Sequence, residues 1–345
     1  MDRVYQRLAL AAQALRYGDQ KPRAKRSYGE LSEQEILEIK RFFPMEKFFI
    51  FGHARSGTTL LARLIRQHPQ VHCNWQAHFF TRPPFLSSLV SDPEVGEWLS
   101  RKSNRWNRGK DLSPVVMRVA SDFILESDAV RVGKTVVGDK SPNNLVNGEA
   151  VLNLAAIYPD AKLIFSVRDG RDAVLSHQIQ KYIDLQDQLN ADEYAIRQSI
   201  IESPEDFSSK KRSIFTPAGL RKSVRDWVRN VTETNNLGEK FYAENYLSLR
   251  FEDLVQNPKT TLIQVWKFLG VDAELPGLED AVTKELSANP DAEWQQDQQR
   301  EVADLIRKGT PGSWREIFTA QDIRSFKEIG GETLIEWGYE ENQEW

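Results

Sequence analysis

The sequence of 345 residues predicts an α/β protein with three layers, in which a central parallel β-sheet lies between two layers of helices. Short apolar runs with the composition of buried strands occur at 47–53, 134–140, 161–169 and 246–254. Segments with helical periodicity separate these runs, which is the order expected of parallel strands joined by right-handed crossovers. Polar motifs follow the runs, so a ligand is expected at the carboxyl ends of the strands.

Helical patterns connect the predicted strands, because apolar residues recur in them at intervals of three or four positions. These segments are 58–67, 147–159, 171–183, 221–237 and 257–270. Two further segments, 82–133 and 184–220, are rich in Ser, Asp, Arg and Pro, and we expect them to be insertions over the site. Residues 44–345 are expected to form a single domain, preceded by an N-terminal helical arm and linker at 1–43.

Composition narrows the classes of function. A formal net charge of −4 and a pI near 5.9 argue against nucleic acid as a general partner. Cys73 is the only cysteine, so no disulfide within the chain and no cysteine-based zinc cluster can form. The N-terminal residues lack the continuous apolar stretch of a signal peptide or membrane anchor. We therefore expect a soluble, cytoplasmic protein without an integral membrane segment; the oligomeric state is not readable.

A glycine-bounded loop follows the first predicted strand. Gly52 and Gly57 bracket the residues His-Ala-Arg-Ser, and Thr58 and Thr59 begin a helix. Backbone amides at a helix N-terminus, together with the helix dipole, favour a bound anion. A loop that binds a nucleoside triphosphate has Lys directly after the second glycine, whereas here the cation is Arg55, before it. The pattern favours a less highly charged phosphate that is bound without magnesium.

The order Arg55, Ser56, Gly57, Thr58, Thr59 resembles the 5′-phosphosulfate loop of sulfotransferases that use 3′-phosphoadenosine 5′-phosphosulfate (PAPS). The similarity covers about 47–317 and includes three further motifs in the family's order. It implies the sulfotransferase fold, which is related to that of the P-loop nucleotide hydrolases. It also implies PAPS as the donor co-substrate, adenosine 3′,5′-bisphosphate as the product, and no requirement for a metal.

A second motif lies at the end of the strand predicted at 161–169. Arg168 closes this strand and Ser176 follows in the next helix, which is similar to the family's site for the 3′-phosphate of the donor. An arginine fork and a hydroxyl are chemically suited to a phosphate monoester. A purely structural pair of Arg168 with Asp172 is the alternative.

A third motif near the C-terminus consists of Arg307, Lys308 and Gly309. It resembles the segment with which the family closes over the same 3′-phosphate, where the two cations supply charge and the glycine allows a close approach of the backbone. An ordinary basic turn is the alternative interpretation.

The resemblance also implies a catalytic arrangement. Lys140, at the end of the strand predicted at 134–140, is similar to a lysine that some relatives place beside the sulfuryl group. Arg55, Lys140, Thr58 and the loop amides are the expected donors to the charge that develops on the transferred and leaving groups.

The general base departs from the family pattern. Many relatives place Glu eight residues after the histidine that corresponds to His68, whereas this chain has Gln76 there, and glutamine is not a useful proton acceptor. We expect His78 to serve as the base, with a structural role as the alternative. His53 and His177 are further candidates.

Other interpretations stay open at this point. A non-catalytic protein with the PAPS-binding fold fits the loss of the family base. A P-loop nucleotide kinase would need a carboxylate for magnesium, for which Asp139 is the only plausible residue. The acceptor is expected to be a small molecule or a glycan, and a sugar, a phenol or a lipid-like alcohol fits equally.

Several aromatic and acidic residues are less informative. Trp227 and Trp314 can stack on an adenine, although packing in the core is the default for tryptophan. Glu252 and Asp253 are interpreted as helix caps or helix partners rather than as catalytic acids.

Overall fold

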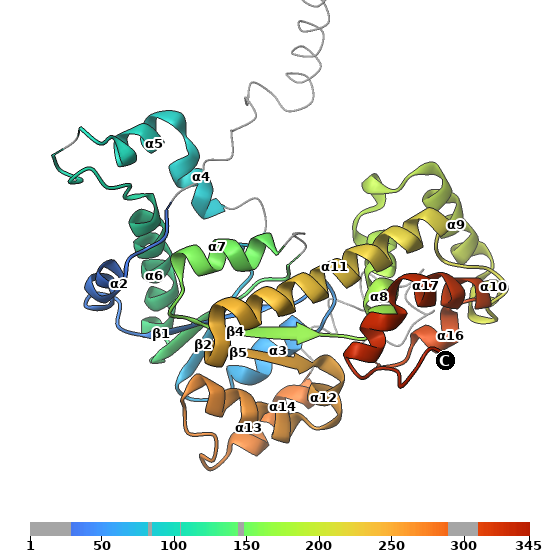
Figure 1. Cartoon of the computed structure of the whole chain (residues 1–345). Helices are drawn as coiled ribbons and strands as arrows, with labels where there is room; N and C mark the ends of the chain where they lie inside the picture. The colour runs from blue at the N-terminus through green and yellow to red at the C-terminus, as the bar shows by residue number, and fades with distance from the viewer. Residues whose placement is uncertain (1–28, 82–84, 104, 144–147, 289–309) are drawn as a thin grey trace, which may run out of the picture.

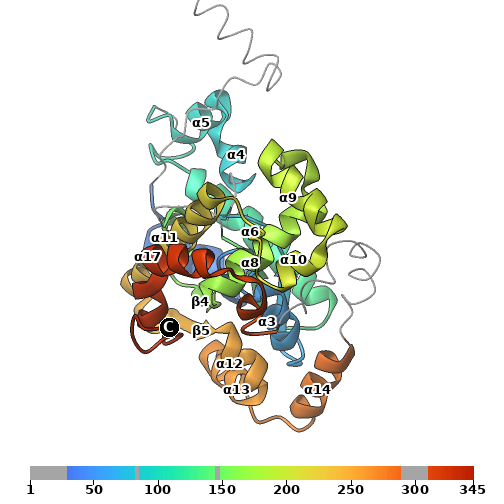
Figure 2. The same ribbon diagram turned by 90° about the vertical axis from the view of Figure 1, so that its right-hand side faces the viewer.

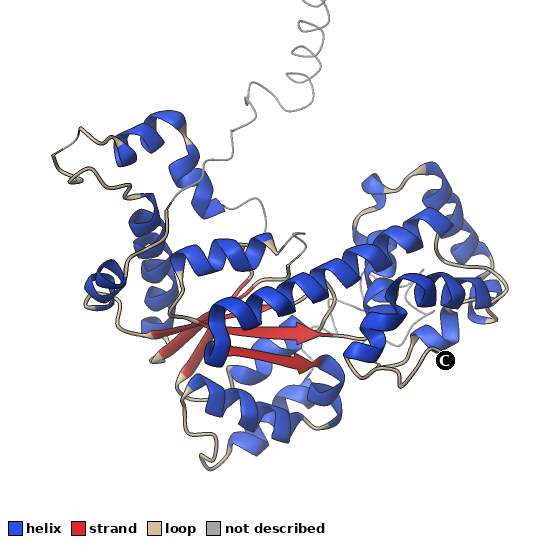
Figure 3. Ribbon diagram, viewed as in Figure 1, coloured by secondary structure: helices blue, strands red, loops and turns tan. Residues whose placement is uncertain are grey.

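The structure, a computed structural model, describes residues 29–81, 85–103, 105–143, 148–288 and 310–345 (Figure 1). In this part of the chain one parallel sheet of five strands has the order β2-β3-β1-β4-β5. The strands are β1 (Glu46–Phe51), β2 (Val71–Trp75), β3 (Val136–Lys140), β4 (Lys162–Val167) and β5 (Tyr246–Arg250). Figure 3 shows the strands between helices on both faces. The predicted three-layer α/β fold with a central parallel sheet is therefore confirmed.

Helices account for most of the remaining described chain. On the N-terminal side they are α2 (Glu33–Lys40), α3 (Thr58–Ile65), α4 (Phe85–Ser91), α5 (Pro93–Ser100), α6 (Ser113–Arg131), α7 (Glu149–Ile157) and α8 (Gly170–Asp184). They continue with η1 (Gln186–Gln188), α9 (Ala191–Glu202), α10 (Pro204–Ser208), α11 (Pro217–Tyr242), η2 (Ala243–Asn245), α12 (Phe251–Gln256) and α13 (Pro258–Leu269). The last are α14 (Leu278–Ala288), α16 (Trp314–Ile317) and α17 (Ala320–Glu336).

Alternate residues of the central strand β1 enter two separate cores. Phe48 and Ile50 of β1 pack with α3, α12, α13 and α14, whereas Phe49 and Phe51 pack with α6, α7, α8, α11 and α17. Figures 1 and 2 agree on this division, with α12–α14 on one side of the sheet and α11 and α17 on the other. The period of two in a strand sends neighbouring side chains to opposite faces, so a strand that is apolar throughout belongs in the middle of the sheet.

Strand β2 was not predicted. Its sequence, Val71 to Trp75, alternates apolar with polar residues and lies at an edge of the sheet, beside β3. Val71 and Cys73 enter one core, and on the other face His72 Nε2 and Asn74 Oδ1 lie 2.7 Å apart in a hydrogen bond. A strand with one polar face gives no continuous apolar run.

Helix α6 lies within the segment 82–133 and packs against β2, β3 and α7. Its Arg118 is fully buried and forms ion pairs with Asp122 at 2.8 Å and Asp160 at 2.7 Å. A second pair joins Lys47 of β1 to Asp122 at 3.5 Å. Paired charges of this kind keep a buried arginine compatible with the core. In Figure 1, α9 and α10 lie on the side to which the strands point, and α4 and α5 lie toward the other end. That both segments are insertions over the site stays a prediction.

Of the N-terminal arm and linker predicted at 1–43, residues 1–28 lie outside the described residues, and the remainder contains α2; the motif at 307–309 also lies outside them. Among the helices that the structure describes, none has both the length and the apolar character needed to cross a bilayer.

Candidate active site

The loop between β1 and α3 has the geometry of an anion site. Gly57 is the N-cap of α3 with φ +75°, and a Cβ there would lie 2.0 Å from the Phe251 ring, so only glycine fits. Arg55 also has a positive φ, +74°, which is strained for a residue with a side chain and is a feature that gathers at functional sites. The buried Ser56 Oγ has no hydrogen-bond partner among the described residues. A buried hydroxyl without a partner suits a bound oxyanion.

The first and second motifs come together in space. Arg55 Nε donates a hydrogen bond to Ser176 Oγ at 3.0 Å, and Arg168 Nη1 donates to the Arg55 carbonyl at 3.2 Å. Burial, and then the positive charge of Arg168, lower the pKa of Arg55. The buried Nε of Arg168 has no partner within the described chain. The two guanidinium groups bring positive charge to the same loop and therefore favour the binding of an anion there.

Asp172 forms its hydrogen bonds with a backbone segment, whereas the alternative considered above paired it with Arg168. Its carboxylate accepts hydrogen bonds from the backbone amides of Gly312 at 2.6 Å and Trp314 at 2.9 Å. Burial raises the pKa of Asp172, while the charge of Arg168 opposes that rise. Asp172 therefore fastens the segment that follows the third motif onto α8, the helix that carries Ser176.

Lys140 lies at the carboxyl end of β3, between the edge strand β2 and the central strand β1. It pairs in register with Ile50 of β1 and Trp75 of β2. Its side chain is fully buried, and its Nζ donates to Thr59 Oγ1 at 3.0 Å and lies 5.4 Å from the centroid of the Trp75 ring. The ammonium group is thereby fixed at the first turn of α3, where the loop that follows β1 ends.

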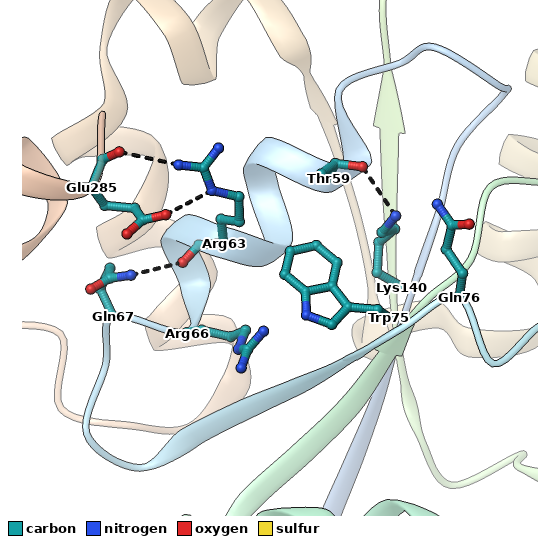
Figure 4. Close-up of a pocket in the computed structure, with 8 residues that line it drawn as sticks. All are labelled: Thr59, Arg63, Arg66, Gln67, Trp75, Gln76, Lys140 and Glu285. Carbon is teal, nitrogen blue, oxygen red and sulfur yellow. Dashed lines mark hydrogen bonds and ion pairs between the residues drawn. The ribbon is translucent and has the colours of Figure 1, made fainter. Parts of the chain in front are cut away.

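Gln76 occupies the site that the resemblance assigns to a base. It has a positive φ of +51°, and its backbone N–H donates to the Lys140 carbonyl at 2.8 Å. Figure 4 shows its side chain beside that of Lys140 at one end of a cavity. Position 76 is therefore part of the site, but its glutamine side chain has no ionisable group.

His78 is buried beneath this region. Its backbone N–H donates to Ser141 Oγ at 3.0 Å, and its Nδ1 is hydrogen-bonded to Thr81 Oγ1 at 2.8 Å. It does not line either of the two polar cavities described below. These contacts suit a structural histidine, and the catalytic role of His78 stays a prediction.

His53 and His177 line a cavity of about 390 Å³ together with Lys222, Asp226 and Asn230. Burial lowers the pKa of His53 to about 4, and the neighbouring His177 adds to this effect. The pKa of His177 is also lowered, by burial and then by the charge of Arg55. Both imidazoles are therefore neutral at pH 7, the form in which a histidine accepts a proton.

Asp139, at the end of β3, is hydrogen-bonded to the segment that follows β2 and to Ser141. Its carboxylate accepts hydrogen bonds from the backbone N–H of Ala77 at 2.9 Å and from the Ser141 hydroxyl. Burial raises the pKa of Asp139 to about 6. Its oxygens thus hold the segment that carries Gln76 and His78 against the strand.

The two tryptophans considered for adenine pack in the core. Trp227 is fully buried and lies against Phe326, with ring centroids 5.9 Å apart. Trp314 is covered by Arg171, whose Cζ lies 4.1 Å from its ring centroid. Glu252 accepts hydrogen bonds from the Asp169 amide at 3.1 Å and the Tyr339 hydroxyl at 2.9 Å, as a scaffold residue does.

Sequence reasoning missed one side of the site. A cavity of about 590 Å³ opens beside Thr59 and Lys140, and Figure 4 shows the residues that line it. The residues not predicted are Arg63, Arg66, Gln67 and Glu285, whereas Trp75 lies in the segment 74–135 that was expected to shape the acceptor pocket. A signal was present, because Thr59 and Arg63 lie four residues apart on one face of α3, and Gln67 follows at the same interval just after the helix ends.

A model of the sulfotransferase family matches residues 47–274, which is more than half of the chain. The chain belongs to this family. A protein-tyrosine sulfotransferase A of Caenorhabditis elegans is 27% identical over 252 residues, covering 69% of this chain and 54% of its own length. A bifunctional heparan sulfate N-deacetylase/N-sulfotransferase 4 of Mus musculus is 23% identical, covering 66% of this chain and 22% of its own length. The chain thus spans about half or less of these two relatives.

Among solved structures, a sulfotransferase of Alicyclobacillus acidocaldarius has 21% identity and a TM-score of 0.40, covering 78% of this chain and 98% of that one. A mouse sulfotransferase complexed with PAP has 16% identity and a TM-score of 0.46, covering 88% of this chain and 89% of that one.

Proposed function

We propose that the chain transfers a sulfuryl group from PAPS to a hydroxyl or amine of an acceptor, leaving adenosine 3′,5′-bisphosphate. The observation that carries the proposal is the chain of contacts from Arg168 through Arg55 to Ser176, which joins the β1–α3 loop to the motif after β4. A donor with two separate anionic ends needs two neighbouring anion sites. Membership of the sulfotransferase family supports the same reaction.

The donor would be held from both ends. The amides of the loop, Ser56, Thr58 and Thr59 would bind the phosphosulfate, in line with the unpartnered, buried hydroxyl of Ser56. Arg168 and Ser176 would bind the 3′-phosphate, and the unpartnered Nε of Arg168 fits that role. Arg307, Lys308 and Gly309 are proposed for the same phosphate on the resemblance alone.

The cations would stabilise the charge that moves during transfer. PAPS supplies an activated S–O bond, which breaks toward the 5′-phosphate as the acceptor oxygen or nitrogen bonds to sulfur and releases its proton. Arg55 and Lys140 would donate to the oxygens on which charge gathers, and the bond from Lys140 to Thr59 fixes the ammonium at the loop. Because fixed cations neutralise this charge, the proposal needs no metal. Each donor should contribute about 10²–10³ in rate.

The acceptor must lose a proton during transfer, so the site needs a general base. His78 is proposed as the base, and His53 and His177, both neutral at pH 7, are the alternatives.

A specific observation favours a second function, a non-catalytic PAPS-binding protein: the position beside Lys140 holds the amide of Gln76 in place of a carboxylate. A kinase is disfavoured because Thr58, rather than Lys, follows Gly57.

Two measurements test these alternatives. Saturating adenosine 3′,5′-bisphosphate should raise the melting temperature by several degrees, whereas Mg·ATP should not, since a ligand stabilises only the state that binds it. Stabilisation by Mg·ATP alone would refute the proposal. Transfer from labelled PAPS to a panel of phenols, sugars and amines would then separate an enzyme from a binding protein. A cytoplasmic location is proposed as well, on the basis that the single cysteine, Cys73, is buried and unpaired.

A further inference from the structure

The cavity beside Lys140 and Thr59 lies between α3 and the end of β2 (Figure 4). Its lining contains three cations, Arg63, Arg66 and Lys140, and one carboxylate, Glu285. Glu285 is paired with Arg63, whose Nε lies 2.7 Å from Glu285 Oε1. Among the described residues that line the cavity, positive charge is therefore in excess, and the cavity lies beside Lys140 and Thr59, at the proposed reactive end of the donor.

Arg66 has the features of an anion-binding residue. Its Cζ lies 5.2 Å from the centroid of the Trp75 ring, and no carboxylate in the described part of the chain forms an ion pair with it. Its charge contributes to the lowered pKa values of Lys134 and His72, although burial is the larger cause for both. A guanidinium stacked on an indole keeps its N–H edge available for a planar, bidentate anion such as a carboxylate.

Trp75 connects this cation to the reactive end. The residue is 46% exposed, and Lys140 Nζ lies 5.4 Å from the centroid of its ring, so Arg66 and Lys140 both lie near the same indole. In Figure 4 the ring lies between Arg66 and the Lys140–Gln76 pair. A ring-shaped acceptor stacked on this exposed indole would extend from one cation to the other.

We infer that the acceptor carries a carboxylate on or next to the ring that bears its accepting group, with Arg66 as the residue that selects it and Trp75 as the surface on which the ring stacks. A uronic acid and a phenolic acid share this chemistry. The inference rests on the proposed function, because it places the accepting group beside Lys140.

The test compares two matched pairs of probes: methyl β-glucuronide with methyl β-glucoside, and 4-hydroxyphenylacetate with 4-hydroxyphenylacetamide. Binding is measured by saturation-transfer NMR on the full chain saturated with adenosine 3′,5′-bisphosphate. In at least one pair the acid should bind about 10-fold or more tightly than its neutral partner, as expected for a hydrogen bond to a charged group. The pair that shows the preference identifies the source of the carboxylate. Equal binding within both pairs would overturn the inference.

Variants separate specificity from folding. Arg66→Gln should reduce the preference for the acid to about 2-fold or less and leave binding of the neutral probe within about 2-fold. Arg66→Lys should restore part of the preference, since it keeps the charge and loses the fork. Arg131→Gln, at an exposed arginine of α6, is the control and should change neither value. A preference that survives in Arg66→Gln would refute the role of Arg66. Failure of adenosine 3′,5′-bisphosphate to stabilise the protein would instead refute the donor site.

Discussion

The guanidinium of Arg55 donates to the hydroxyl of Ser176 at 3.0 Å, across 121 positions of sequence. This bond joins the loop after β1 to α8, the helix that follows β4, and Arg168 reinforces it by donating to the Arg55 carbonyl. The strands that carry the two segments are direct neighbours in the sheet. The contact links the two sites that are proposed to bind the two anionic groups of the donor. Substitutions at either site should therefore affect the binding of the same nucleotide.

Arg168→Gln should weaken adenosine 3′,5′-bisphosphate far more than adenosine 5′-monophosphate. The first nucleotide has the 3′-phosphate that Arg168 is proposed to bind, and the second lacks it. Loss of a charge-assisted contact predicts about a 10–100-fold rise in Kd for the bisphosphate. Calorimetric titration measures both nucleotides. Arg221→Gln, at a surface arginine of α11, is the matched control. An equal loss for both nucleotides would contradict the assignment of Arg168.

Lys140→Met should lower kcat by about 10²–10³ and leave the affinity for adenosine 3′,5′-bisphosphate within a few-fold. The reason is that the ammonium, held by Thr59, is proposed to meet charge that grows only during transfer. Single-turnover kinetics with labelled PAPS measure the chemical step directly. Lys259→Met, at an exposed lysine of α13, should have no effect. A defect confined to KM would show that Lys140 only binds.

His78→Asn should lower kcat by about 10²–10⁴ if His78 is the base, and adding Gln76→Glu should recover part of that loss. Gln76 lies beside Lys140 and is exposed, so a glutamate there would ionise without a burial cost. The readout is the pH profile of kcat, in which the acidic limb should move toward the pKa of a carboxylate. If His78→Asn retains full activity and only lowers the melting temperature, His78 is structural.

Asp139→Asn should change how stability depends on pH. The native state raises the pKa of Asp139 from 3.8 to about 6, so its ionisation opposes folding. Its favourable contribution is complete below about pH 3.8 and is lost as the pH rises through about 6. The shift corresponds to about 3 kcal/mol in the free energy of unfolding. Asparagine does not ionise, so the variant should gain stability relative to the native protein between pH 4 and pH 7.

Urea unfolding at several pH values measures this difference. Asp187→Asn, at an exposed position, should give a difference that hardly varies with pH. A difference for Asp139→Asn that is constant from pH 4 to pH 7 would show that the carboxyl is not perturbed in the native state.

The strands of the fold could be predicted from the sequence where they form short runs rich in apolar residues. The apolar runs of β1, β3, β4 and β5 were each predicted and are confirmed. Strand β2 was missed because His72 and Asn74 give it a polar face at the sheet edge. Periodicity detects burial, and an edge strand with one polar face resembles a loop.

The sequence predicted those site residues that follow a predicted strand or lie in the helix after it. The structure brings Arg55, Arg168 and Ser176 together: Arg55 lies in the loop between β1 and α3, Arg168 directly follows β4, and Ser176 lies within α8, the next helix. Arg66 and Glu285 were not predicted, because their presence in one cavity depends on how α14 packs on α3, and no local pattern encodes that packing. His78 was proposed from its residue type, and only its contacts with Ser141 and Thr81 show how enclosed it is.

The strand order β2-β3-β1-β4-β5 places the two proposed binding regions at different parts of the sheet's carboxyl edge. Contacts proposed for the nucleotide come from the loop after β1, the first turn of α3, the end of β4 and α8. The cavity proposed for the acceptor is lined from the rest of α3, the ends of β2 and β3, and α14, with Lys140 and Thr59 at the border. The acceptor half can therefore change residue by residue while the nucleotide half stays intact. For protein engineering, this makes Arg66 and Trp75 the positions at which to randomise a library for new acceptors.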